Sequence, residues 1–234
     1  MNALVVCPTY NERANLPVLV PAVLAHEGFR MLIVDDGSPD GTGQVAEELA
    51  ARFPGRIEVM HRTGQRGLGR SYVDGLRRAL ETDAELICQM DADLSHGPEY
   101  LPALAAGTAQ FDVVIGSRYL HGVSVVNWPL HRIFLSTFAN RYIKFVTRLS
   151  PKDCTSGFRC WRREALARLP LESVVSDGYA FLIEMLFEAS RRGARIGEVP
   201  IIFVERREGQ SKVSKAVLLE SLITPWRLTL RGRT

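Results

Sequence analysis

The sequence predicts an α/β fold with a mostly parallel central sheet flanked by helices. Short apolar runs with the length of strands alternate with longer, helix-like segments through the first half of the chain. These runs are apolar throughout, as is typical of parallel strands covered by helices on both faces. The 234 residues, 46% of them hydrophobic and 24% charged, suffice for one large domain with a sizeable core.

Five strands and four intervening helices are expected in the first half. The first apolar run ends at Pro8, and the helix after it has Asn15 as its expected cap and Pro17 in its first turn. A glycine-rich turn precedes the second helix, and each later helix follows another apolar run. The strands are Ala3–Cys7, Met31–Val34, Ile57–His61, Leu86–Met90 and Val113–Ile115, and the helices are Asn15–Ala25, Thr42–Phe53, Ser71–Glu81 and Glu99–Ala106.

The pattern changes after Gly116. A long helix is expected first, and a strand, a helix and one or two strands interrupted by Pro200 follow it. The C-terminal segment is also expected to be helical, and Pro225 should break or kink any helix there. The expected ranges are His131–Leu149, Gly157–Arg162, Tyr179–Arg192 and Ile196–Val204.

Charge, cysteine content and hydropathy exclude several classes of protein. The net charge of +3 and the pI near 8.8 are too mild to indicate nucleic-acid binding. The four cysteines show no metal-ligand or redox spacing, which favours a reducing, intracellular setting. No apolar stretch approaches 18 residues, and the N-terminal run is too short for a signal peptide. We therefore expect a cytoplasmic protein without a transmembrane helix.

Two carboxylates, Asp91 and Asp93, follow the strand expected at Leu86–Met90. Strand alternation would place residues i and i+2 on the same side, so both carboxylates could face one point. Open α/β sheets bind ligands at the carboxyl ends of their strands. Mg²⁺ prefers oxygen ligands and commonly uses one or two carboxylates with substrate phosphates. The pair therefore predicts a site for a metal and a diphosphate, although an acidic pair alone can also cap a helix or solvate a turn.

Polar loops follow the other expected strands at the same edge of the sheet. Tyr10 could stack on a base, and Glu12 or Asp36 could accept hydrogen bonds from a base or ribose. Each loop alone is compatible with ordinary turn chemistry, and only their convergence favours a ligand site. The segment Gly64–Ser71 is close to a P-loop but has Arg70 where lysine is required, so a nucleotide triphosphatase is disfavoured.

Six motifs follow one another along nearly the whole chain: Pro8–Glu12, Val34–Thr42, Gly67–Gly69, Met90–His96, Gly116–Tyr119 and Gly197–Pro200. Together they resemble the family 2 glycosyltransferases, and within these the polyprenyl-phosphate (dolichyl-phosphate) mannose synthases of the short form without a transmembrane domain. The segment Asp153–Arg159 resembles a further part of the family pattern. The resemblance implies a GT-A nucleotide-sugar-binding fold in a single catalytic domain, residues 1–234. Residues 1–119 would bind the nucleotide, and residues 120–234 would form the acceptor side.

The resemblance also implies roles for individual positions. Asp91 and Asp93 would hold Mg²⁺ or Mn²⁺ and would act in catalysis together with Arg118. The nucleotide sugar would contact Pro8, Tyr10, Glu12, Val34, Asp36, Asp91, Ala92, Asp93, Arg118, Arg206 and Lys212. The acceptor phosphate would contact Arg118, Arg132 and Ser136. Ser95 stands where many bacterial members have glutamine, which leaves a third protein ligand open, and His96 is expected to shape the turn or support the ligands.

The reaction implied by the resemblance transfers mannose from GDP-mannose to a polyprenyl phosphate, with a metal ion and with inversion. A phosphate monoester has a second pKa near 6 and is largely anionic at neutral pH, so no general base is required. UDP-glucose or another nucleotide sugar, or a saccharide or protein acceptor, remains an alternative, and a hydroxyl acceptor would need a carboxylate base such as Glu184 or Asp177. A sugar-phosphate nucleotidyltransferase lacks support because no glycine- and lysine-rich loop follows Pro8. A binding module without catalysis is the third alternative.

Two segments are candidates for contact with a membrane that holds a polyprenyl acceptor. In the helix expected at His131–Leu149, apolar side chains share one arc and basic ones another edge, and the C-terminal segment has a similar composition. The apolar residues are Phe134, Phe138, Tyr142, Phe145 and Val146 in the first segment and Leu218, Leu219, Leu222, Ile223, Trp226 and Leu230 in the second. We expect a peripheral enzyme on the cytosolic face, although a helix packed on the core would give the same pattern.

Overall fold

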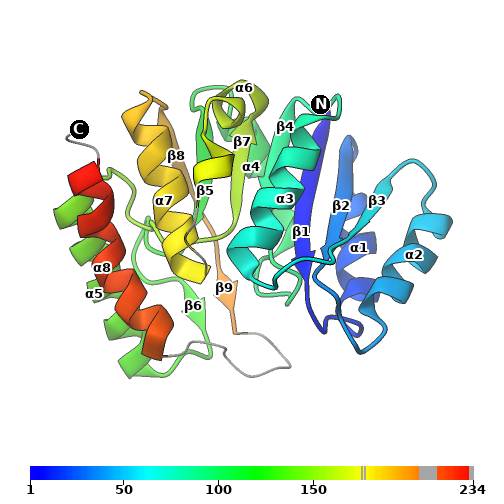
Figure 1. Cartoon of the computed structure of the whole chain (residues 1–234), viewed down its shortest axis with the longest axis horizontal. Coiled ribbons are helices and arrows are strands. Elements are labelled where there is room, and N and C mark those ends of the chain that lie inside the picture. Colours follow the sequence, from blue (N-terminus) through cyan, green and yellow to red (C-terminus); the bar gives the residue numbers. More distant parts are fainter. Residues whose placement is uncertain (175, 177, 206–214, 232–234) are drawn as a thin grey trace.

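A seven-stranded sheet forms the centre of the molecule (Figure 1). The structure is a computed structural model that describes residues 1–174, 176, 178–205 and 215–231. The strands lie in the order β3-β2-β1-β4-β7-β5-β8, and all are parallel to their neighbours except β7, which runs antiparallel to β4 and β5. They span β1 Ala3–Thr9, β2 Phe29–Asp35, β3 Ile57–His61, β4 Leu86–Gln89, β5 Val113–Ser117, β7 Arg159–Arg162 and β8 Ile196–Pro200.

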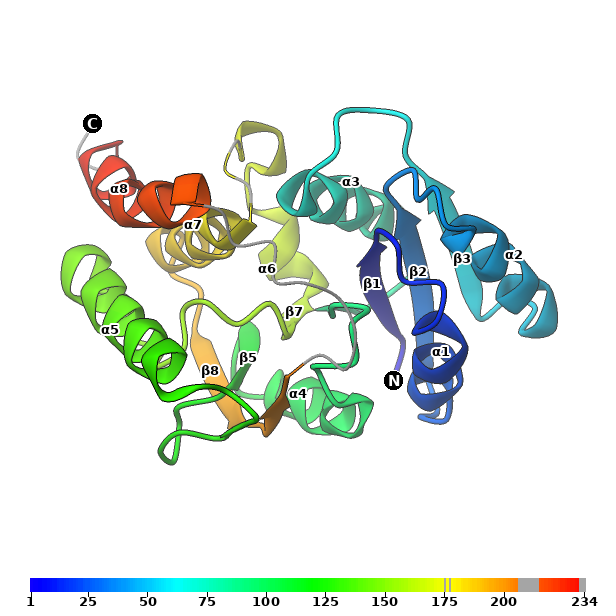
Figure 2. The same ribbon diagram turned by 90° about the horizontal axis from the view of Figure 1, so that it is seen from below.

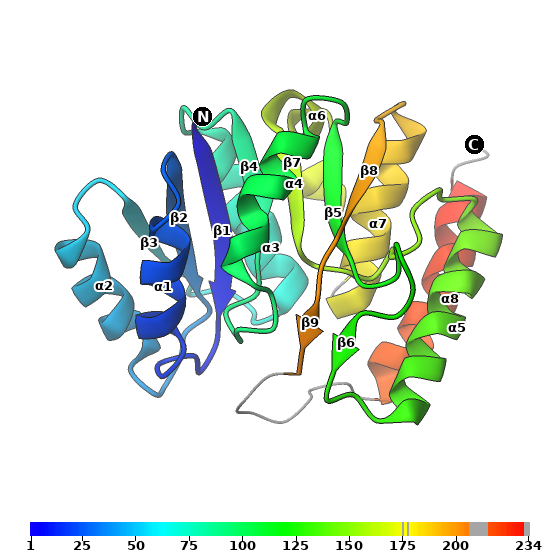
Figure 3. The same cartoon turned by 180° about the vertical axis from the view of Figure 1, so that it is seen from behind.

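Helices cover both faces of this sheet (Figures 2 and 3). On one face pack α1 (Leu16–Leu24), α2 (Thr42–Arg52) and α4 (Leu101–Gly107), and on the other pack α3 (Leu68–Leu80), α6 (Arg163–Ala167) and α7 (Gly178–Arg191). Strand β1 contacts the helices on both faces of the sheet: Ala3, Val5 and Cys7 face α1, while Leu4 and Val6 face α3. The continuous apolar strands thus reflect burial on two faces, as expected.

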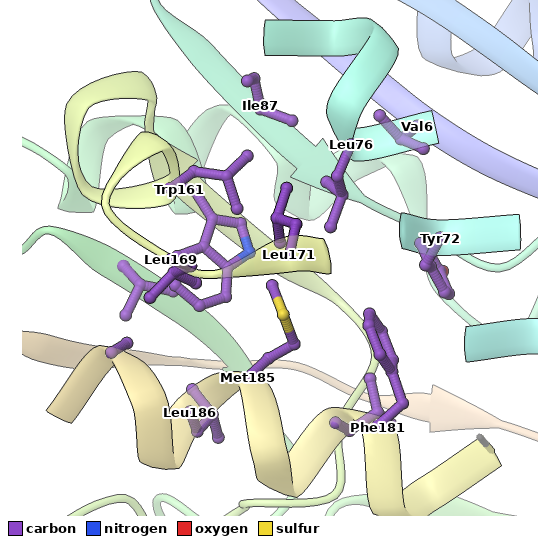
Figure 4. Close-up of a cluster of buried hydrophobic side chains, with 14 of the residues drawn as sticks. Val6, Tyr72, Leu76, Ile87, Trp161, Leu169, Leu171, Phe181, Met185 and Leu186 are labelled. Atoms are coloured by element: carbon purple, nitrogen blue, oxygen red, sulfur yellow. The ribbon is translucent and has the colours of Figure 1, made fainter. Parts of the chain in front are cut away.

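The core between the sheet and α3 and α7 is built around large side chains (Figure 4). Trp161 of β7 is fully buried and donates its Nε1 hydrogen to Oε1 of Gln89 on β4, at 2.8 Å. The rings of Tyr72 (α3) and Phe181 (α7) stack with centroids 5.7 Å apart. These contacts tie β7 and α7 to the first half of the sheet.

The second half of the chain adds elements beside and below the sheet. Helices α5 (Leu130–Thr147) and α8 (Lys215–Arg231) pack against each other, and α8 also packs on α7 (Figures 1 and 3). A short parallel pair, β6 (Val125–Val126) and β9 (Phe203–Val204), lies at the lower edge in Figure 1, where β1 and β2 end. Two short 3-10 helices, η1 (Pro98–Tyr100) and η2 (Leu171–Ser173), complete the described structure.

The fold class and nearly all expected elements are confirmed, with four corrections. Strand β4 ends one residue earlier than expected, and α3 begins three residues earlier, directly after Gly67. Neither β6 nor α6 was expected, because two and five residues give too little periodicity to detect. Of the two outcomes expected at Pro225, a break does not occur: helix α8 continues through it, because Thr224 and Leu228 are buried, and this packing offsets the lost backbone hydrogen bond.

Gly75 lets α3 lie directly on β1 and β2. A Cβ atom at this position would lie 2.6 Å from Cγ1 of Val6 and 2.8 Å from Cγ2 of Val34. We expect Gly75→Ala to lower the free energy of unfolding by about 1–3 kcal/mol, because overpacking forces side chains or backbone to shift. Urea denaturation measures this loss. Gly64→Ala is the control, since its Cβ would meet only Nη2 of Arg62, at 3.9 Å. A Gly75→Ala protein as stable as wild type would show that relieving the clash costs no more than the roughly 1 kcal/mol by which alanine is favoured over glycine in a helix.

Candidate active site

A cavity of about 560 Å³ opens at the carboxyl ends of β1, β2 and β4. Loops that follow β1 to β5 line one part of it, and the loop before β7, Trp128 and residues from α3, α5, α7 and β9 line the rest. The cavity brings together Pro8, Tyr10, Glu12, Asp36, Asp91, Ala92, Asp93, Arg118 and Arg132 from the set expected from the sequence.

The remaining expected residues lie elsewhere. The side chain of Val34 is fully buried in the core and does not line the cavity, and Ser136 accepts a hydrogen bond from the hydroxyl of Tyr119 at 2.7 Å outside the lining. Arg206 and Lys212 lie outside the described residues. The candidate base Glu184 is buried and accepts the backbone N–H of Ser176 rather than lining the cavity, and Asp177 lies outside the described residues.

The loops after β1 and β2 are fastened to each other. The backbone N–H of Asn11 donates to Oγ of Ser38 at 3.1 Å, and the backbone N–H of Glu12 donates to Oγ1 of Thr42 at 2.9 Å. The amide of Asn15 donates to the Glu12 carboxylate at 2.6 Å instead of capping α1. These bonds hold one wall of the cavity in a fixed shape.

Tyr10 and Asp36 on this wall each have an arginine partner. Arg66 lies over the Tyr10 ring, with Cζ 4.9 Å from the ring centroid, and donates to its hydroxyl at 2.8 Å. Asp36 pairs with the buried Arg62 and accepts the backbone N–H of Gly67 at 2.9 Å. The glycine-rich segment before α3 is therefore joined to the end of β2, which explains why it lies beside the predicted nucleoside pocket.

Asp91 and Asp93 both line the cavity, but for a different reason from the one expected. Strand β4 ends at Gln89, so the pair lies in a loop and strand alternation does not orient it. Leu94 has a positive φ of 62°, which turns the loop after the pair. Local hydrogen bonds then fix the carboxylates: Oδ1 of Asp91 accepts the Tyr72 hydroxyl at 2.7 Å, and Oδ1 of Asp93 accepts Oγ of Ser95 at 2.5 Å.

The side chain of His96 stabilises this loop through a hydrogen bond with its backbone. It is buried, its ring stacks on Phe158 with centroids 5.0 Å apart, and its Nδ1 accepts the backbone N–H of Asp91 at 3.2 Å. Burial lowers the pKa of His96, so the imidazole is neutral at pH 7. Burial and the adjacent Asp91 carboxylate raise the pKa of Tyr72 well above its usual value, so its hydroxyl remains a donor.

The acidic pair offers a donor set for a hard divalent cation. No group of three or more His, Cys, Asp or Glu side chains suited to a metal occurs among the described residues. Zinc sites take three or four such protein ligands, whereas Mg²⁺ often takes one or two carboxylates and completes its shell with phosphates and water. The residues present fit Mg²⁺ or Mn²⁺ bound together with a diphosphate.

Arg118 lies across the cavity in a buried ion pair. Its Nε and Nη2 atoms donate to the two carboxylate oxygens of Asp153, each at 2.7 Å, and Nη2 also donates to Oγ1 of Thr155. Burial alone would raise the pKa of Asp153, but the Arg118 guanidinium reverses this effect and holds the pKa below its ordinary value. Both groups are therefore charged at neutral pH, and Arg118 is held rigidly.

Arg132 lies nearer the surface than Arg118. Its guanidinium pairs with Glu205 and lies over the Trp128 ring, with Cζ 4.1 Å from the ring centroid. Of the three residues expected to contact the acceptor phosphate, Arg118 and Arg132 therefore line the cavity and Ser136 does not. The lining thus contains the acidic pair Asp91 and Asp93 together with Arg118 and Arg132.

Several lining residues were missed by the sequence analysis. Tyr72 carries no local signal, because a tyrosine on the buried side of a helix reads as core. Trp128 precedes Pro129 at the start of a helix, a position that favours an extended residue but not a ligand contact. Thr155 and Ser156 lie in the segment that resembled the family pattern, but no role was assigned to them.

Comparison with known proteins gives close relatives over nearly the full chain. The chain is 45% identical over 232 residues to the polyprenol monophosphomannose synthase of Mycolicibacterium smegmatis, covering 98% of this chain and 88% of the relative. It is 41% identical over 234 residues to the undecaprenyl-phosphate mannosyltransferase of Micrococcus luteus, covering 99% and 96%.

Solved structures with low sequence identity share the fold. Glucosyl-3-phosphoglycerate synthase from Mycobacterium tuberculosis, in complex with Mn²⁺, UDP and glucosyl-3-phosphoglycerate, aligns with a TM-score of 0.69 at 18% identity, covering 99% of this chain and 79% of that one. A mannosyltransferase from Pyrobaculum calidifontis in complex with GDP-Man and Mn²⁺ aligns with a TM-score of 0.58 at 17% identity, covering 99% and 73%. The expected GT-A fold is confirmed.

The family model described as glycosyl transferase family 2 matches residues 4–169. This match includes the loops after β1, β2, β4 and β5 that line the cavity. With two relatives above 40% identity across the whole chain, it shows that the protein belongs to glycosyl transferase family 2.

Proposed function

We propose that the protein transfers mannose from GDP-mannose to a polyprenyl phosphate, with a divalent metal ion and inversion at the anomeric carbon. The observation that carries this proposal is one cavity lined both by the Asp91 and Asp93 carboxylates and by Arg118 and Arg132. A donor diphosphate with its metal fits the aspartates, and an acceptor phosphate fits the arginines. The two relatives with more than 40% identity, whose names specify polyprenol or undecaprenyl phosphate mannosylation, support this choice of substrates.

The donor end of the cavity suits a nucleoside diphosphate sugar. Tyr10 offers a ring for the base, and Glu12 and Asp36 offer carboxylate oxygens as acceptors. Asp91 and Asp93 would hold Mg²⁺ or Mn²⁺, which when bound acts as a Lewis acid that stabilises the diphosphate leaving group. Tyr72 and Ser95 keep the two carboxylates in place before the donor arrives.

The acceptor end supplies positive charge rather than a base. A phosphate monoester is already largely anionic at pH 7, so it needs orientation and not deprotonation. Arg118 and Arg132 are suited to this task, because guanidinium groups bind phosphate oxygens through paired hydrogen bonds. Glu184, the described carboxylate considered as a base for a hydroxyl acceptor, does not line the cavity. This arrangement favours a phosphate over a saccharide acceptor.

The proposed reaction predicts a labelled lipid product. With radiolabelled GDP-mannose, Mg²⁺ or Mn²⁺ and a polyprenyl phosphate, we expect label to enter the organic phase in a product stable to alkaline phosphatase. UDP-glucose in place of GDP-mannose, and dephosphorylated polyprenol in place of the acceptor, are the matched controls. Label that enters the lipid from UDP-glucose alone, or equally with polyprenol, would contradict the proposed substrates.

The acidic pair predicts strict dependence on a divalent metal. We expect Asp93→Ala to lower kcat/KM by roughly 100-fold or more, because a carboxylate that holds the metal–diphosphate unit is lost. Calorimetry should show weaker Mn²⁺ binding in the presence of GDP, and EDTA should abolish turnover by the wild type. Glu164→Ala, which removes an exposed carboxylate on α6, is the control. An Asp93→Ala enzyme that is folded and retains metal-dependent turnover would disprove the assignment.

We further propose that the protein binds the cytosolic surface of a membrane through α5 and α8. Large apolar side chains on these packed helices are exposed and form what we call the α5–α8 surface: Phe134, Phe138, Phe145, Leu222, Ile223, Trp226 and Leu230. Among the described residues, no helix has the length and apolar character needed to cross a bilayer. An exposed apolar face of this kind marks an interaction site.

The arc expected on α5 needs correction in one respect. Val146 is buried with Ile143, and the hydroxyl of Tyr142 donates to the backbone oxygen of Leu222 on α8 at 2.7 Å. The side of α5 that carries Tyr142 and Val146 faces the core and α8. Of the expected arc, Phe134, Phe138 and Phe145 are therefore the exposed residues. Leu218 and Leu219 belong to α8, but their side chains are outside the described set.

If the α5–α8 surface binds a membrane, substitutions that place charged side chains on it should weaken this binding. We expect Phe138→Glu/Trp226→Glu to lower flotation with liposomes by at least roughly 10-fold, because two exposed aromatic side chains no longer enter the interface. Val18→Glu/Ala51→Glu adds the same charge to exposed positions of α1 and α2 and should float like wild type. GDP affinity should not change in either variant. Unchanged flotation of the first variant would refute the proposal.

A further inference from the structure

One hydrogen-bond donor in the cavity has no partner among the residues that the structure describes. Nε1 of Trp128 is shielded from solvent, its side chain lines the cavity, and no described atom accepts its hydrogen. An indole nitrogen can only donate, and a buried donor without an acceptor costs free energy. A ligand that places an acceptor at this nitrogen would remove that cost.

The Trp128 ring is held in place before any ligand binds. Asn127, with a positive φ of 64°, turns the chain after β6, and Pro129 follows Trp128 as the N-cap of α5. The edge of the ring meets Phe203 of β9 at a centroid distance of 5.4 Å and an interplanar angle of 73°. Trp128 is therefore positioned by three elements at once.

Two cations flank the same ring. Cζ of Arg132 lies 4.1 Å and Cζ of Arg118 lies 5.6 Å from its centroid. The Trp128 ring therefore lies in a part of the cavity where guanidinium groups already concentrate positive charge. The carboxylate of Glu205 is bound to Arg132, so an anion already contacts one of these groups. Donors and positive charge together select an anion with several acceptor oxygens.

We propose that the indole N–H of Trp128 is an additional donor to the phosphate group of the lipid acceptor, beside Arg132. In this arrangement the ring has two functions: it orients Arg132 by stacking, and its nitrogen binds a phosphate oxygen that the arginine does not use. Trp128 thus selects a phosphate monoester and positions it. The inference rests on the proposed function, because it identifies the anion at Arg132 as the phosphate of polyprenyl phosphate.

Kinetics of a variant that lacks only the N–H tests this proposal. Trp128→Phe keeps an aromatic ring for Arg132, and benzothienylalanine at position 128 replaces the N–H by sulfur in a side chain of nearly the same shape. For both, we expect KM for polyprenyl phosphate to rise about 10-fold to 100-fold, the range for losing a hydrogen bond to a charged group. KM for GDP-mannose should not change. Wild-type KM for the acceptor in the benzothienylalanine enzyme would overturn the proposal, and so would an equal rise for the donor.

Binding without turnover provides a second, independent test. The chain has three tryptophans, and a Trp226→Phe background removes the exposed one. In this background, we expect a short-chain isoprenyl phosphate to change the emission of Trp128 in a saturable manner, whereas the corresponding isoprenol should not. Inorganic phosphate should compete with the isoprenyl phosphate. The signal should disappear in Trp226→Phe/Trp128→Phe and weaken in Trp226→Phe/Arg132→Ala.

The two tests separate the inference from the proposed function. If no mannosyl lipid forms but the isoprenyl phosphate still changes Trp128 emission, the reaction is wrong and the phosphate site stands. If mannosyl lipid forms but the isoprenyl phosphate and the isoprenol change the emission equally, Trp128 senses the lipid chain and the phosphate assignment is wrong.

Discussion

The reversed direction of β7 is the constraint on which the rest of the site depends. In an all-parallel sheet, only the loops after the strands would reach the edge where the cavity opens. Because β7 runs antiparallel between β4 and β5, the segment before it reaches that edge and places Thr155, Ser156 and Gly157 beside the acidic pair. A side chain at Gly157 would bring its Cβ to 3.5 Å from the Asp91 carboxylate, so this segment lies directly against the proposed metal site.

The same reversal creates the buried ion pair between Arg118 and Asp153. Arg118 follows β5, whereas Asp153 precedes β7, and the two meet because the strands run in opposite directions. Removing two charges from water is expensive, and good geometry with further hydrogen bonds is needed to offset the cost. Both carboxylate oxygens of Asp153 accept from Arg118, and Thr155 and the Arg118 backbone N–H add further bonds. An arginine fixed in this way can present charge to a phosphate without reorganising.

The sequence predicted those features that follow from local pattern and failed where distant residues decide. The apolar runs correctly predicted the strands and their burial on two faces, and the polar loops at the strand ends correctly predicted most of the cavity lining. The pair Asp91 and Asp93 was found, although alternation was the wrong reason, since Tyr72 on α3 and Ser95 orient it. Trp128 was missed because its significance lies in Arg132 and Phe203, which only the folded chain brings to it. The continuation of α8 through Pro225 likewise depends on neighbouring helices.

The arginines around the cavity differ in burial. This difference separates ion pairs that persist from pairs in which a ligand anion can replace the carboxylate. The side chains of Arg62 and Asp36 are 6% and 8% exposed, and those of Arg118 and Asp153 are 6% and 0% exposed. Breaking a buried pair by removing one partner costs about 3–5 kcal/mol, so these pairs persist when a ligand binds. Arg132 and Glu205 are 27% and 25% exposed, and solvent screens a pair of this kind, which typically contributes only about 0–1 kcal/mol. A phosphate with up to two negative charges can therefore replace the Glu205 carboxylate at Arg132 while Arg118 keeps Asp153. The acceptor end would then gain its ligand by exchanging one anion for another, without exposing an unpaired buried charge.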